Sequence, residues 1–583
     1  MTFWEAFFRV ILLRPGQALR ALYWHLTKRR VRARNEIRRG AALLPNAHYF
    51  WIRTREEQPD YARRLSELGQ RQTPPSTFEI ALLDYGDLTA IERTLKSLED
   101  QKYPHWQLCI ASPQARVLPK GLASSTNLRS VEAEGSALFD AVQAALRDSS
   151  ADLIIPVRAG DTFAPAALLY FAEALADQPD ASILYGDEDE ISRRGRRSNP
   201  WFKPQWNEEL FLGLDYLSGA CALSVRAAAQ PIQGSALATM SDLLFALAGE
   251  GRPIVHVPHI VIHKASAERP TRDEHMEAAT RLVQPRGGSV APGPFDTVKV
   301  TWPLPAELPL VSMIVPTRDR LELLQPCIDG VLATTSYSPY EVLVVDNGSS
   351  ARATHEYLRT IAQHPAVRVL SYNQPYNFSA INNFAAGQAS GAYLCLLNND
   401  TEVIEERWLT EMMRFAVRDE IGAVGAKLLY ENGAIQHAGV VVGMGDAAGH
   451  AHRFTRSDET GYFRLPHVAH FVTAVTAACM VVARRKFDAV GGLDEEHFPV
   501  AYNDVDFCLK LQLAGYRNVY VPHAVLLHHE SMSRGDDKAK QHIKRYSREL
   551  ATLQQRWGTK TYQDPMLNPN LDRYSETFIV ALD

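Results

Sequence analysis

Apolar runs that end in polar residues recur along the chain, and they alternate with stretches in which apolar residues lie three or four positions apart. In the C-terminal half, "VSMIVPTRDR" (311–320) leads through such a stretch to "YEVLVVDNGSS" (340–350). In the N-terminal half, "FEIALLDYGD" (78–87) leads in the same way to "WQLCIAS" (106–112). The apolar runs predict buried strands and the wider spacing predicts helices. Strands that alternate with helices predict an α/β fold with mostly parallel sheets.

This pattern occurs twice. The first copy closes with "GRPIVHVPHIVIHK" (251–264) and the second with the similar "GYRNVYVPHAVLLHHE" (515–530). A stretch rich in proline and glycine, residues 284–309, lies between the copies and predicts a linker. The length of 583 residues also favours two or three domains. We therefore expect a repeated domain.

Five segments follow from these boundaries. They are a basic amphipathic N-terminal segment (1–75), a first α/β domain (76–283), a linker (284–309), a second α/β domain (310–535) and a C-terminal helical tail (536–583) that we expect to be peripheral.

Composition narrows the function classes. The chain has 46% hydrophobic and 22% charged residues and a net charge of −5, which is typical of a folded protein and argues against a nucleic-acid partner. Its six cysteines form no CxxC pair, so we expect buried free thiols in a reducing, cytoplasmic compartment. We find neither a signal peptide nor a run of eighteen uncharged apolar residues, and therefore expect no membrane span.

The first forty residues differ from the rest. They contain ten Lys and Arg residues against Glu5 and Glu36, interleaved with aromatic and aliphatic residues. A basic amphipathic segment of this kind suits the surface of an anionic membrane. An amphipathic helix docked on the protein itself would have the same pattern, and the sequence leaves both alternatives open.

Polar residues at strand ends are the first candidates for a binding site, because open α/β sheets bind ligands beyond the carboxyl ends of their strands. Asp346 ends one apolar run, and Asn398, Asn399 and Asp400 end another. Acids placed in this way suit a nucleotide ribose or a divalent cation. The same residues also form good turns, so neither motif decides the question alone.

A second candidate region is "VGGLDEEHFPVAYNDVDFCLKLQLAGY" (490–516), which places five acidic residues ahead of an apolar helical pattern. Asp504 and Asp506 either cap this helix or include a residue that does chemistry at its first turn. Asp494 and Glu495 follow a Gly-Gly turn and either line a substrate or are solvated loop acids.

The order of the motifs is more specific than any one of them. "VVDNGS", "NNDT", "GGLDEEHF", "YNDVDFCLKLQLAGY" and "LLHHESMSRG" follow one another in the second copy. This series resembles the family 2 glycosyltransferases of the GT-A fold, and more narrowly their bacterial polysaccharide and O-antigen branch. The resemblance is strong over 310–535 and weaker over 78–264. It implies two GT-A-like domains, of which the first is degenerate.

The resemblance also implies a donor site that binds a nucleoside-diphosphate sugar. Its residues would be Pro316, Thr317, Arg318, Asp346, Asn383, Asn398 and Asn399. Asp400 stands at the last acid of the family's Asp-x-Asp motif, with Asn398 at its first position. His528, or failing that His529, would complete a site for Mg²⁺ or Mn²⁺.

For catalysis, the resemblance assigns Asp504 to the second position of the family's Glu-Asp pair and hence to the general base. Asn503 replaces the Glu of that pair. A single base opposite the leaving group implies inversion at the anomeric carbon. Asp506 would cap the helix or orient the loop, while Asp494, Glu495 and Asn503 would lie on the acceptor side.

The first copy lacks key residues when the strand ends are aligned. Ser112 stands opposite Asp346 and Met240 opposite Asp504, while Asp161 keeps the acid of the metal loop. Because methionine accepts no proton, we expect the first domain to be catalytically silent.

Together these features predict an inverting glycosyltransferase that acts on a glycan or a polyprenyl-linked or other lipid-linked acceptor in bacterial surface-polysaccharide synthesis, at the cytoplasmic face of the inner membrane. The alternative is a non-catalytic scaffold that binds glycan or nucleotide in a polysaccharide assembly complex. A Rossmann dehydrogenase is disfavoured, because no GxGxxG follows the first strand of either copy.

Overall fold

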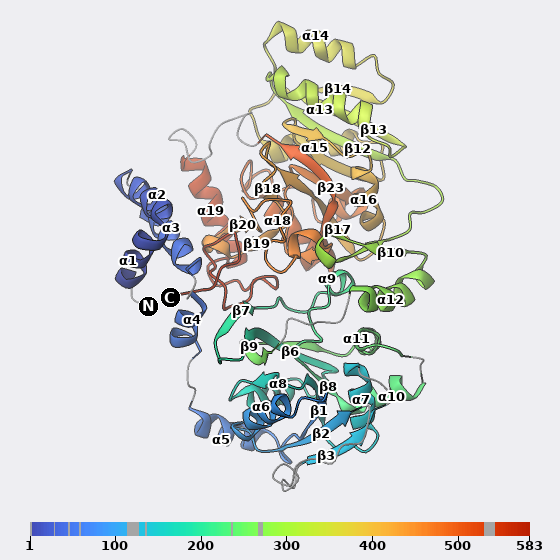
Figure 1. Cartoon of the computed structure of the whole chain (residues 1–583). Coiled ribbons are helices and arrows are strands. Elements are labelled where there is room, and N and C mark those ends of the chain that lie inside the picture. Colours follow the sequence, from blue (N-terminus) through green and yellow to red (C-terminus); the bar gives the residue numbers. More distant parts are fainter. Residues whose placement is uncertain are drawn as a thin grey trace.

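The computed structural model places two α/β domains one above the other, with the N-terminal helices along one side and the two chain ends next to each other (Figure 1). The structure describes residues 3–27, 30–44, 47–56, 60–112, 128–133, 137–234, 237–265, 272–529 and 543–582.

The second domain is built on a mixed sheet with the order β14-β13-β12-β15-β22-β17-β23-β16. Its strands are β12 (Val311–Thr317), β13 (Tyr340–Asp346), β14 (Val367–Ser371), β15 (Tyr393–Leu397), β16 (Thr401–Val403), β17 (Ile421–Leu429), β22 (Cys479–Ala483) and β23 (Arg517–His528). The four strands from β14 to β15 are parallel, and β22 enters antiparallel between β15 and β17. The carboxyl ends of β12, β13 and β15 therefore meet at one edge.

The first domain repeats this arrangement strand for strand, in the order β3-β2-β1-β4-β8-β6-β9-β5. Its strands are β1 (Phe78–Leu83), β2 (Trp106–Ser112), β3 (Leu128–Glu132), β4 (Leu153–Arg158), β5 (Thr162–Phe163), β6 (Ile183–Ile191), β8 (Cys221–Ser224) and β9 (Ile254–Lys264). The register matches as well, because Phe78 on β1 and Val311 on β12 each begin pairing with the first residue of both neighbouring strands. The predicted fold class, two GT-A-like α/β domains, is confirmed.

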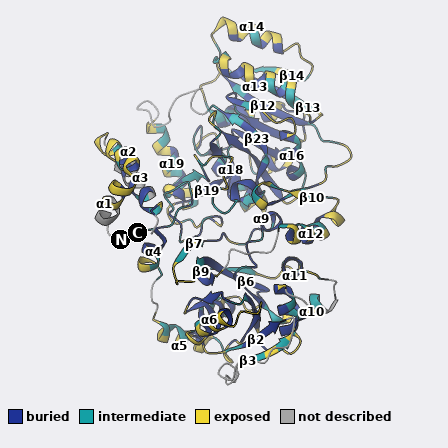
Figure 2. Cartoon of the chain, viewed as in Figure 1, coloured by how far each residue is buried: buried dark blue, intermediate teal, exposed yellow. Residues whose placement is uncertain are grey.

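Helices cover both faces of each sheet (Figure 2). In the first domain these are α6 (Leu88–Glu99), α7 (Leu138–Leu146), α8 (Ala167–Asp177), α9 (Glu208–Gly213), α10 (Val225–Gly234), α11 (Met240–Gly249) and α12 (Arg272–Val283). In the second they are α13 (Leu321–Thr334), α14 (Arg352–Ile361), α15 (Phe378–Gln388), α16 (Trp408–Ala416), α17 (Arg484–Ala489), α18 (Asn503–Leu513) and α19 (Ile543–Trp557). On α16, Trp408, Met412 and Phe415 are buried in the core, as their helical spacing predicts.

The predicted linker is ordered and packs between the domains. It forms a hairpin of β10 (Ser289–Pro292) and β11 (Val298–Thr301). The indole of the buried Trp302 donates to Glu209 of the first domain at 3.3 Å and lies 4.6 Å below the guanidinium of Arg418 of the second. Glu209 and Arg418 also form an ion pair with each other.

The segment after α19 differs from the peripheral tail that we expected. Asn568 donates to Asp187 of the first domain at 2.9 Å, and Asp564 accepts from the backbone N–H of Val442 of the second domain at 2.7 Å. The tail therefore joins the two domains.

The N-terminal helices are α1 (Phe3–Leu13), α2 (Pro15–Leu26), α3 (Arg30–Ala42), α4 (Ala47–Thr54) and α5 (Tyr61–Arg71). The first three pack against one another through Val10, Ala21, Ile37 and Ala41. Among the side chains that the structure describes, α1 and α2 expose Phe8, Ile11, Leu12, Leu13, Leu19, Leu22, Tyr23 and Leu26. In the part of the chain that the structure describes, every helix is too short or too polar to cross a bilayer. All six cysteines are buried free thiols, as predicted.

Candidate active site

The predicted donor residues gather at the carboxyl edge of the second sheet. Because β12 and β15 are parallel neighbours, Thr317 at the end of β12 lies beside the polar loop that follows β15. The amide of Asn399 donates to the Thr317 hydroxyl at 3.1 Å, and both side chains are buried. Pro316 is half-buried, whereas Arg318 is exposed at the start of the next loop.

Asp346 lies one strand further along, paired in register with Thr317. One of its carboxylate oxygens accepts from the backbone N–H of Ser349 at 2.9 Å, which fixes the turn after β13. The side chain is therefore held at the strand end where the sequence placed it.

Asp319 belongs to this edge as well, although it was not among the predicted site residues. Its carboxylate accepts from the backbone N–H groups of Ser350 and Ala351 at 2.9 and 2.8 Å, and so ties the loop after β12 to the loop after β13. These bonds, with that from Ala351 the largest cause, lower the pKa of Asp319. The residue has a positive φ of 51°, a conformation that Asp tolerates better than most residues. The signal in the sequence was an acid two positions after a strand end.

Asp400 and His528 come together as predicted for a metal pair. β16 and β23 are antiparallel neighbours in which Thr401 pairs with His528, and this register places His528 Nε2 3.3 Å from Asp400 Oδ1. Two neighbouring ligands of an octahedral ion with bonds of about 2.1 Å lie at a similar separation, roughly 3 Å. Both side chains are buried, and the Nε2 atom of the imidazole faces the carboxylate.

His529, the alternative metal ligand, directs its side chain to two other carboxylates. Its ring contacts Glu431 at 2.7 Å and Glu402 at 3.2 Å. The geometry therefore favours His528. Among the described residues, no three His, Cys, Asp or Glu side chains come together as a complete metal cage. Asp400 and His528 fit an ion whose remaining ligands come from a substrate.

Asp504 lies in the first turn of α18. Its Oδ2 accepts from the backbone N–H of Ala477 at 3.2 Å and its Oδ1 from that of Val505 at 2.9 Å. Burial raises the pKa of this carboxyl above its usual range, and these two hydrogen bonds oppose the shift only in part.

One segment connects Asp504 with the metal pair. Asn398, which opens the loop of Asp400, donates its backbone N–H to the carbonyl of Ala478 at 3.0 Å. Ala478 directly follows Ala477, the residue that holds Asp504. The candidate base and the candidate metal loop are therefore attached to adjacent residues ahead of β22.

Of the two roles expected for Asp506, capping α18 is wrong, whereas orienting the loop stays a prediction. The N-cap residue is Tyr502, and the fully buried Asp506 accepts instead from Arg556 at 2.8 Å and from the indole of Trp557 at 2.9 Å. Asp506 anchors α19. A local helix signal in the sequence was thus overridden by partners about fifty residues away.

Two other predicted site residues are bonded to nearby backbone. Asn503 is only 3% exposed and donates to the carbonyl of Val500 at 2.7 Å, so its side chain lies inside the loop and not on the surface where an acceptor-side residue was expected. The amide of Asn383 donates to the carbonyl of Leu493 at 2.8 Å and accepts from the N–H of Leu493 at 2.9 Å, so it holds the loop that contains Leu493. Glu495 is exposed, as an acceptor-side residue would be.

The first domain has different chemistry at the same places. Asp161 accepts from the ammonium of Lys264 at 2.5 Å, and the strand pair that positions it (Thr162 with His263) is the counterpart of Thr401 with His528. Met240 is buried in the core. These contacts agree with the predicted loss of function in this copy.

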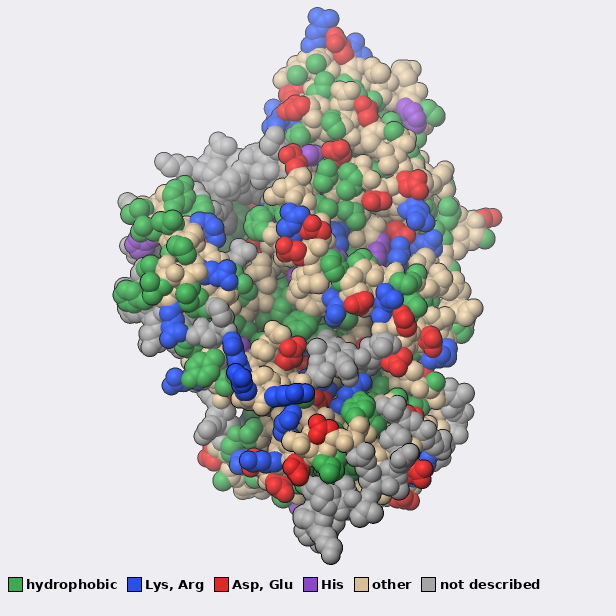
Figure 3. Space-filling view, in the orientation of Figure 1, with side chains coloured by type: hydrophobic (Ala, Val, Ile, Leu, Met, Phe, Trp, Pro, Cys, Tyr) green, Lys and Arg blue, Asp and Glu red, His purple; other side chains and the backbone are tan. Residues whose placement is uncertain are grey.

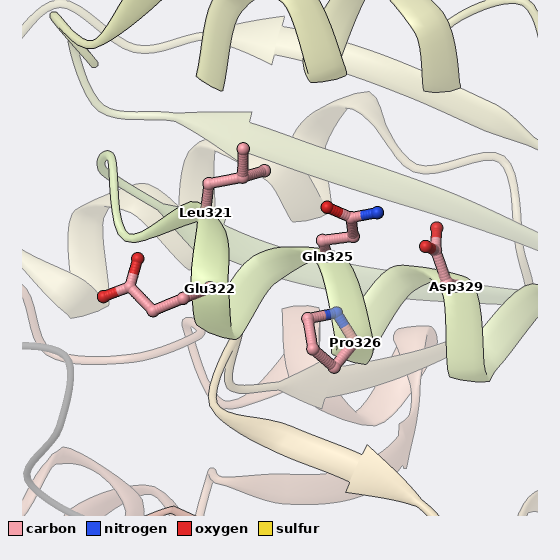
Figure 4. Close-up of a pocket in the computed structure, with 5 residues that line it drawn as sticks. All are labelled: Leu321, Glu322, Gln325, Pro326 and Asp329. Atoms are coloured by element: carbon pink, nitrogen blue, oxygen red, sulfur yellow. The ribbon is translucent and has the colours of Figure 1, made fainter. Parts of the chain in front are cut away.

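The pocket in Figure 4 is separate from the predicted site residues. It has a volume of about 490 Å³ and is lined by residues of α13 alone: Leu321, Glu322, Gln325, Pro326 and Asp329. No predicted site residue contributes to it.

Comparison with known proteins agrees with this geometry. Residues 312–489 match the sequence profile described as "Glycosyl transferase family 2". This domain belongs to that family. The matched segment contains the strand ends at Thr317 and Asp346 and the loop of Asp400, and it ends ahead of the helix of Asp504.

Two relatives extend beyond the family 2 domain. An uncharacterized protein, y4gI, of Sinorhizobium fredii is 36% identical over 89% of this chain and 60% of its own length. The "O-antigen biosynthesis protein RfbC" of Myxococcus xanthus is 34% identical over 77% of this chain and 37% of its own length. The chain thus spans 60% or less of these relatives.

A solved structure is similar at lower identity. The mannosyltransferase PcManGT of Pyrobaculum calidifontis, in complex with GDP-Man and Mn²⁺, matches 46% of this chain and 70% of its own at 16% identity, with a TM-score of 0.33.

Proposed function

We propose that the family 2 domain is an inverting, metal-dependent glycosyltransferase. It moves a sugar from a nucleoside diphosphate to a hydroxyl of a glycan or a lipid-linked acceptor in bacterial surface-polysaccharide synthesis. The single observation that carries this proposal is the attachment of Asp504 and of the Asp400 loop to the adjacent residues Ala477 and Ala478. A base and a cation site that are this close can serve one reacting centre.

In this proposal the donor binds at the carboxyl ends of β12, β13 and β15. Asp346 is placed to accept from a ribose hydroxyl, while Thr317 and Asn399 close the edge beside it. Asn398, half-buried between this edge and His528, is placed to donate to a phosphate. Pro316 and Arg318 shape the loop that would cover the base.

The metal fits the pair Asp400 and His528. A carboxylate and an imidazole suit Mn²⁺. Mg²⁺, which prefers oxygen ligands, is the alternative ion. Such an ion, when bound, neutralises charge on the departing diphosphate.

Proton transfer is assigned to Asp504. The acceptor hydroxyl gives its proton to this carboxylate while its oxygen forms the new bond to the anomeric carbon, and the bond to the diphosphate oxygen breaks. The raised pKa of Asp504 makes it a stronger base than an exposed aspartate. Attack from the side opposite the leaving group inverts the anomeric configuration.

The N-terminal helices support a peripheral site of action at the cytoplasmic face of the inner membrane. Figure 3 shows hydrophobic side chains gathered over α1 and α2, with lysine and arginine side chains beside them. The exposed apolar residues of α1 and α2 include Leu12 and Leu26, which are 79% and 72% exposed. An acceptor held in a membrane would meet the enzyme at such a surface. The name of the Myxococcus relative, an O-antigen biosynthesis protein, is consistent with a lipid-linked glycan.

One experiment separates this enzyme from the alternative of a non-catalytic scaffold. The purified protein is incubated with UDP-, dTDP- and GDP-sugars and Mn²⁺, and nucleotide release and donor binding are both measured. We expect release from at least one donor, and we expect Asp504→Asn to abolish it while donor affinity changes less than about threefold, since the base acts on the acceptor. Asp419→Asn, at an exposed acid of the same domain, is the control. Donor binding without release in the wild type would support the scaffold.

A further inference from the structure

The C-terminal helix α19 holds the loop that leads to the candidate base. Glu549, fully buried on α19, accepts from the backbone N–H groups of Val500 and Ala501 at 3.1 and 3.2 Å. A buried carboxylate that receives two backbone donors fixes their positions, because a donor that is moved away from it inside the protein loses a hydrogen bond that water does not replace.

Arg556 adds a second attachment. Its Nη1 donates to Asp494 and to Asp506, each at 2.8 Å, and thereby joins the start of the loop to α18. The hydroxyl of Tyr546 also lies 2.7 Å from that of Tyr502, the N-cap residue of α18. Contacts from α19 therefore occur at both ends of the segment 494–502.

The start of helix α15 also forms hydrogen bonds with this loop. Asn377 donates to the carbonyl of Glu495 at 2.8 Å and Ser379 to that of Phe498 at 2.6 Å. The loop ends at Asn503, whose side chain is bonded back to Val500, and Asp504 is the next residue. The direction of the Asp504 carboxylate thus depends on a loop held between α15 and α19.

The first domain provides an internal comparison. Its helix α12 follows the last strand, β9, as α19 follows β23, and it also carries an arginine that binds the acid on the preceding helix. There Arg281 directs both Nε and Nη2 to the single carboxylate of Asp242, at 2.8 and 2.7 Å. Arg556 instead divides its contacts between Asp506 and the loop residue Asp494. The anchor is common to both copies, and the loop contact belongs to the copy that has the base.

We propose that Glu549 and Arg556 are positioning residues for catalysis, which fix the loop 494–502 and through it the orientation of Asp504 toward the acceptor hydroxyl. This proposal rests on the proposed function of Asp504 as the general base. A displacement of about 1 Å at a reacting group can cost on the order of 100-fold in rate. Loss of the α19 contacts would therefore lower turnover without touching the donor edge at β12 and β13.

The test uses the full-length protein with variants Glu549→Gln and Arg556→Met, and with Arg281→Met as the matched control. The reaction measured is Mn²⁺-dependent hydrolysis of the nucleotide-sugar that the wild type turns over. We expect both α19 variants to lower kcat by about 10–100-fold while KM for the donor stays within about twofold. Arg281→Met breaks the equivalent arginine–aspartate pair, so it should lower Tm but leave kcat unchanged.

A second readout needs no turnover. Amide hydrogen exchange at Val500 and Ala501 should accelerate in Glu549→Gln and stay unchanged in Arg281→Met. If exchange at these amides is unchanged, or if kcat of Arg556→Met equals that of Arg281→Met, the positioning role is wrong. If Arg556→Met does not fold, Arg556→Lys replaces it, because lysine keeps the charge but lacks the guanidinium group that contacts Asp494 and Asp506. A wild type that hydrolyses no donor would contradict the proposed function, and the exchange result would still decide the role of α19.

Discussion

Lys264 places its ammonium against the carboxylate of Asp161, where the second domain has His528 against Asp400. Both residues of the first pair are buried. The first domain therefore pairs the acid of this loop with a lysine, whereas the second pairs it with a histidine. This contact neutralises the buried acid that the first copy keeps in this loop.

The first prediction concerns this ion pair. Lys264→Met would leave the Asp161 carboxylate buried and unpaired, which costs about 3–5 kcal/mol. We expect the free energy of unfolding in urea to fall by this order, and Asp161→Asn added to Lys264→Met to restore most of it. Hydrolysis of the nucleotide-sugar should keep its wild-type kcat. A loss below about 1 kcal/mol would contradict a structural role for the pair.

The second prediction concerns the metal pair. Asp400→Asn removes a charged oxygen ligand, so we expect the affinity for Mn²⁺ to fall by more than the roughly 10–100-fold that loss of an outer-shell partner costs. The measurement is Mn²⁺ binding by electron paramagnetic resonance with UDP present. Asp161→Asn is the matched control, because Lys264 already neutralises that carboxylate. Equal Mn²⁺ affinities of the two variants would exclude Asp400 as a ligand.

The third prediction concerns pH. Burial raises the pKa of Asp504, so this carboxyl stays protonated to a higher pH than an exposed aspartate. Since the protonated form cannot accept a proton, kcat/KM should fall as the pH decreases through the raised pKa. The acidic limb should therefore lie above the value of about 3.9 for an ordinary aspartate. A limb at or below that value would show that another group, or a less buried Asp504, governs the rate.

The fold could largely be predicted from the sequence. Strand and helix periods are local properties, and the two copies report the same order of elements independently. The entry of β22 between β15 and β17 could not be predicted, because strand order is set by pairing between residues far apart in the chain.

The site residues also differ in whether their roles depend on nearby sequence or on residues far away in the chain. Thr317 and Asp346 end strands and Asp400 lies in the loop directly after one, and a strand end can be recognised from the residues around it. The task of Asp506 depends on Arg556, fifty positions away, and that of Asn383 on Leu493, so neither has a local signal. Asp319 was missed for a related reason: its partners Ser350 and Ala351 belong to the loop after the next strand.

The last prediction tests the membrane surface of the N-terminal helices. Leu12 and Leu19 are 79% and 67% exposed on α1 and α2, and burying a leucine in a bilayer interface contributes up to about 1.5–3 kcal/mol. The double variant Leu12→Ser with Leu19→Ser should therefore have a partition coefficient for phosphatidylglycerol vesicles, measured by co-sedimentation, that is lower by about 100-fold or more. Basic residues should add roughly 1 kcal/mol each at low salt, so binding to phosphatidylcholine vesicles should be weaker.

The matched control for this experiment is Leu513→Ser, since Leu513 is 78% exposed on α18 of the second domain. It should bind vesicles as the wild type does, because its side chain is not part of the apolar face of α1 and α2. High salt should release the wild type only partly, since screening removes the electrostatic attraction and leaves the apolar contribution. Should the double variant sediment with vesicles like the wild type, this face of α1 and α2 does not dock on membranes.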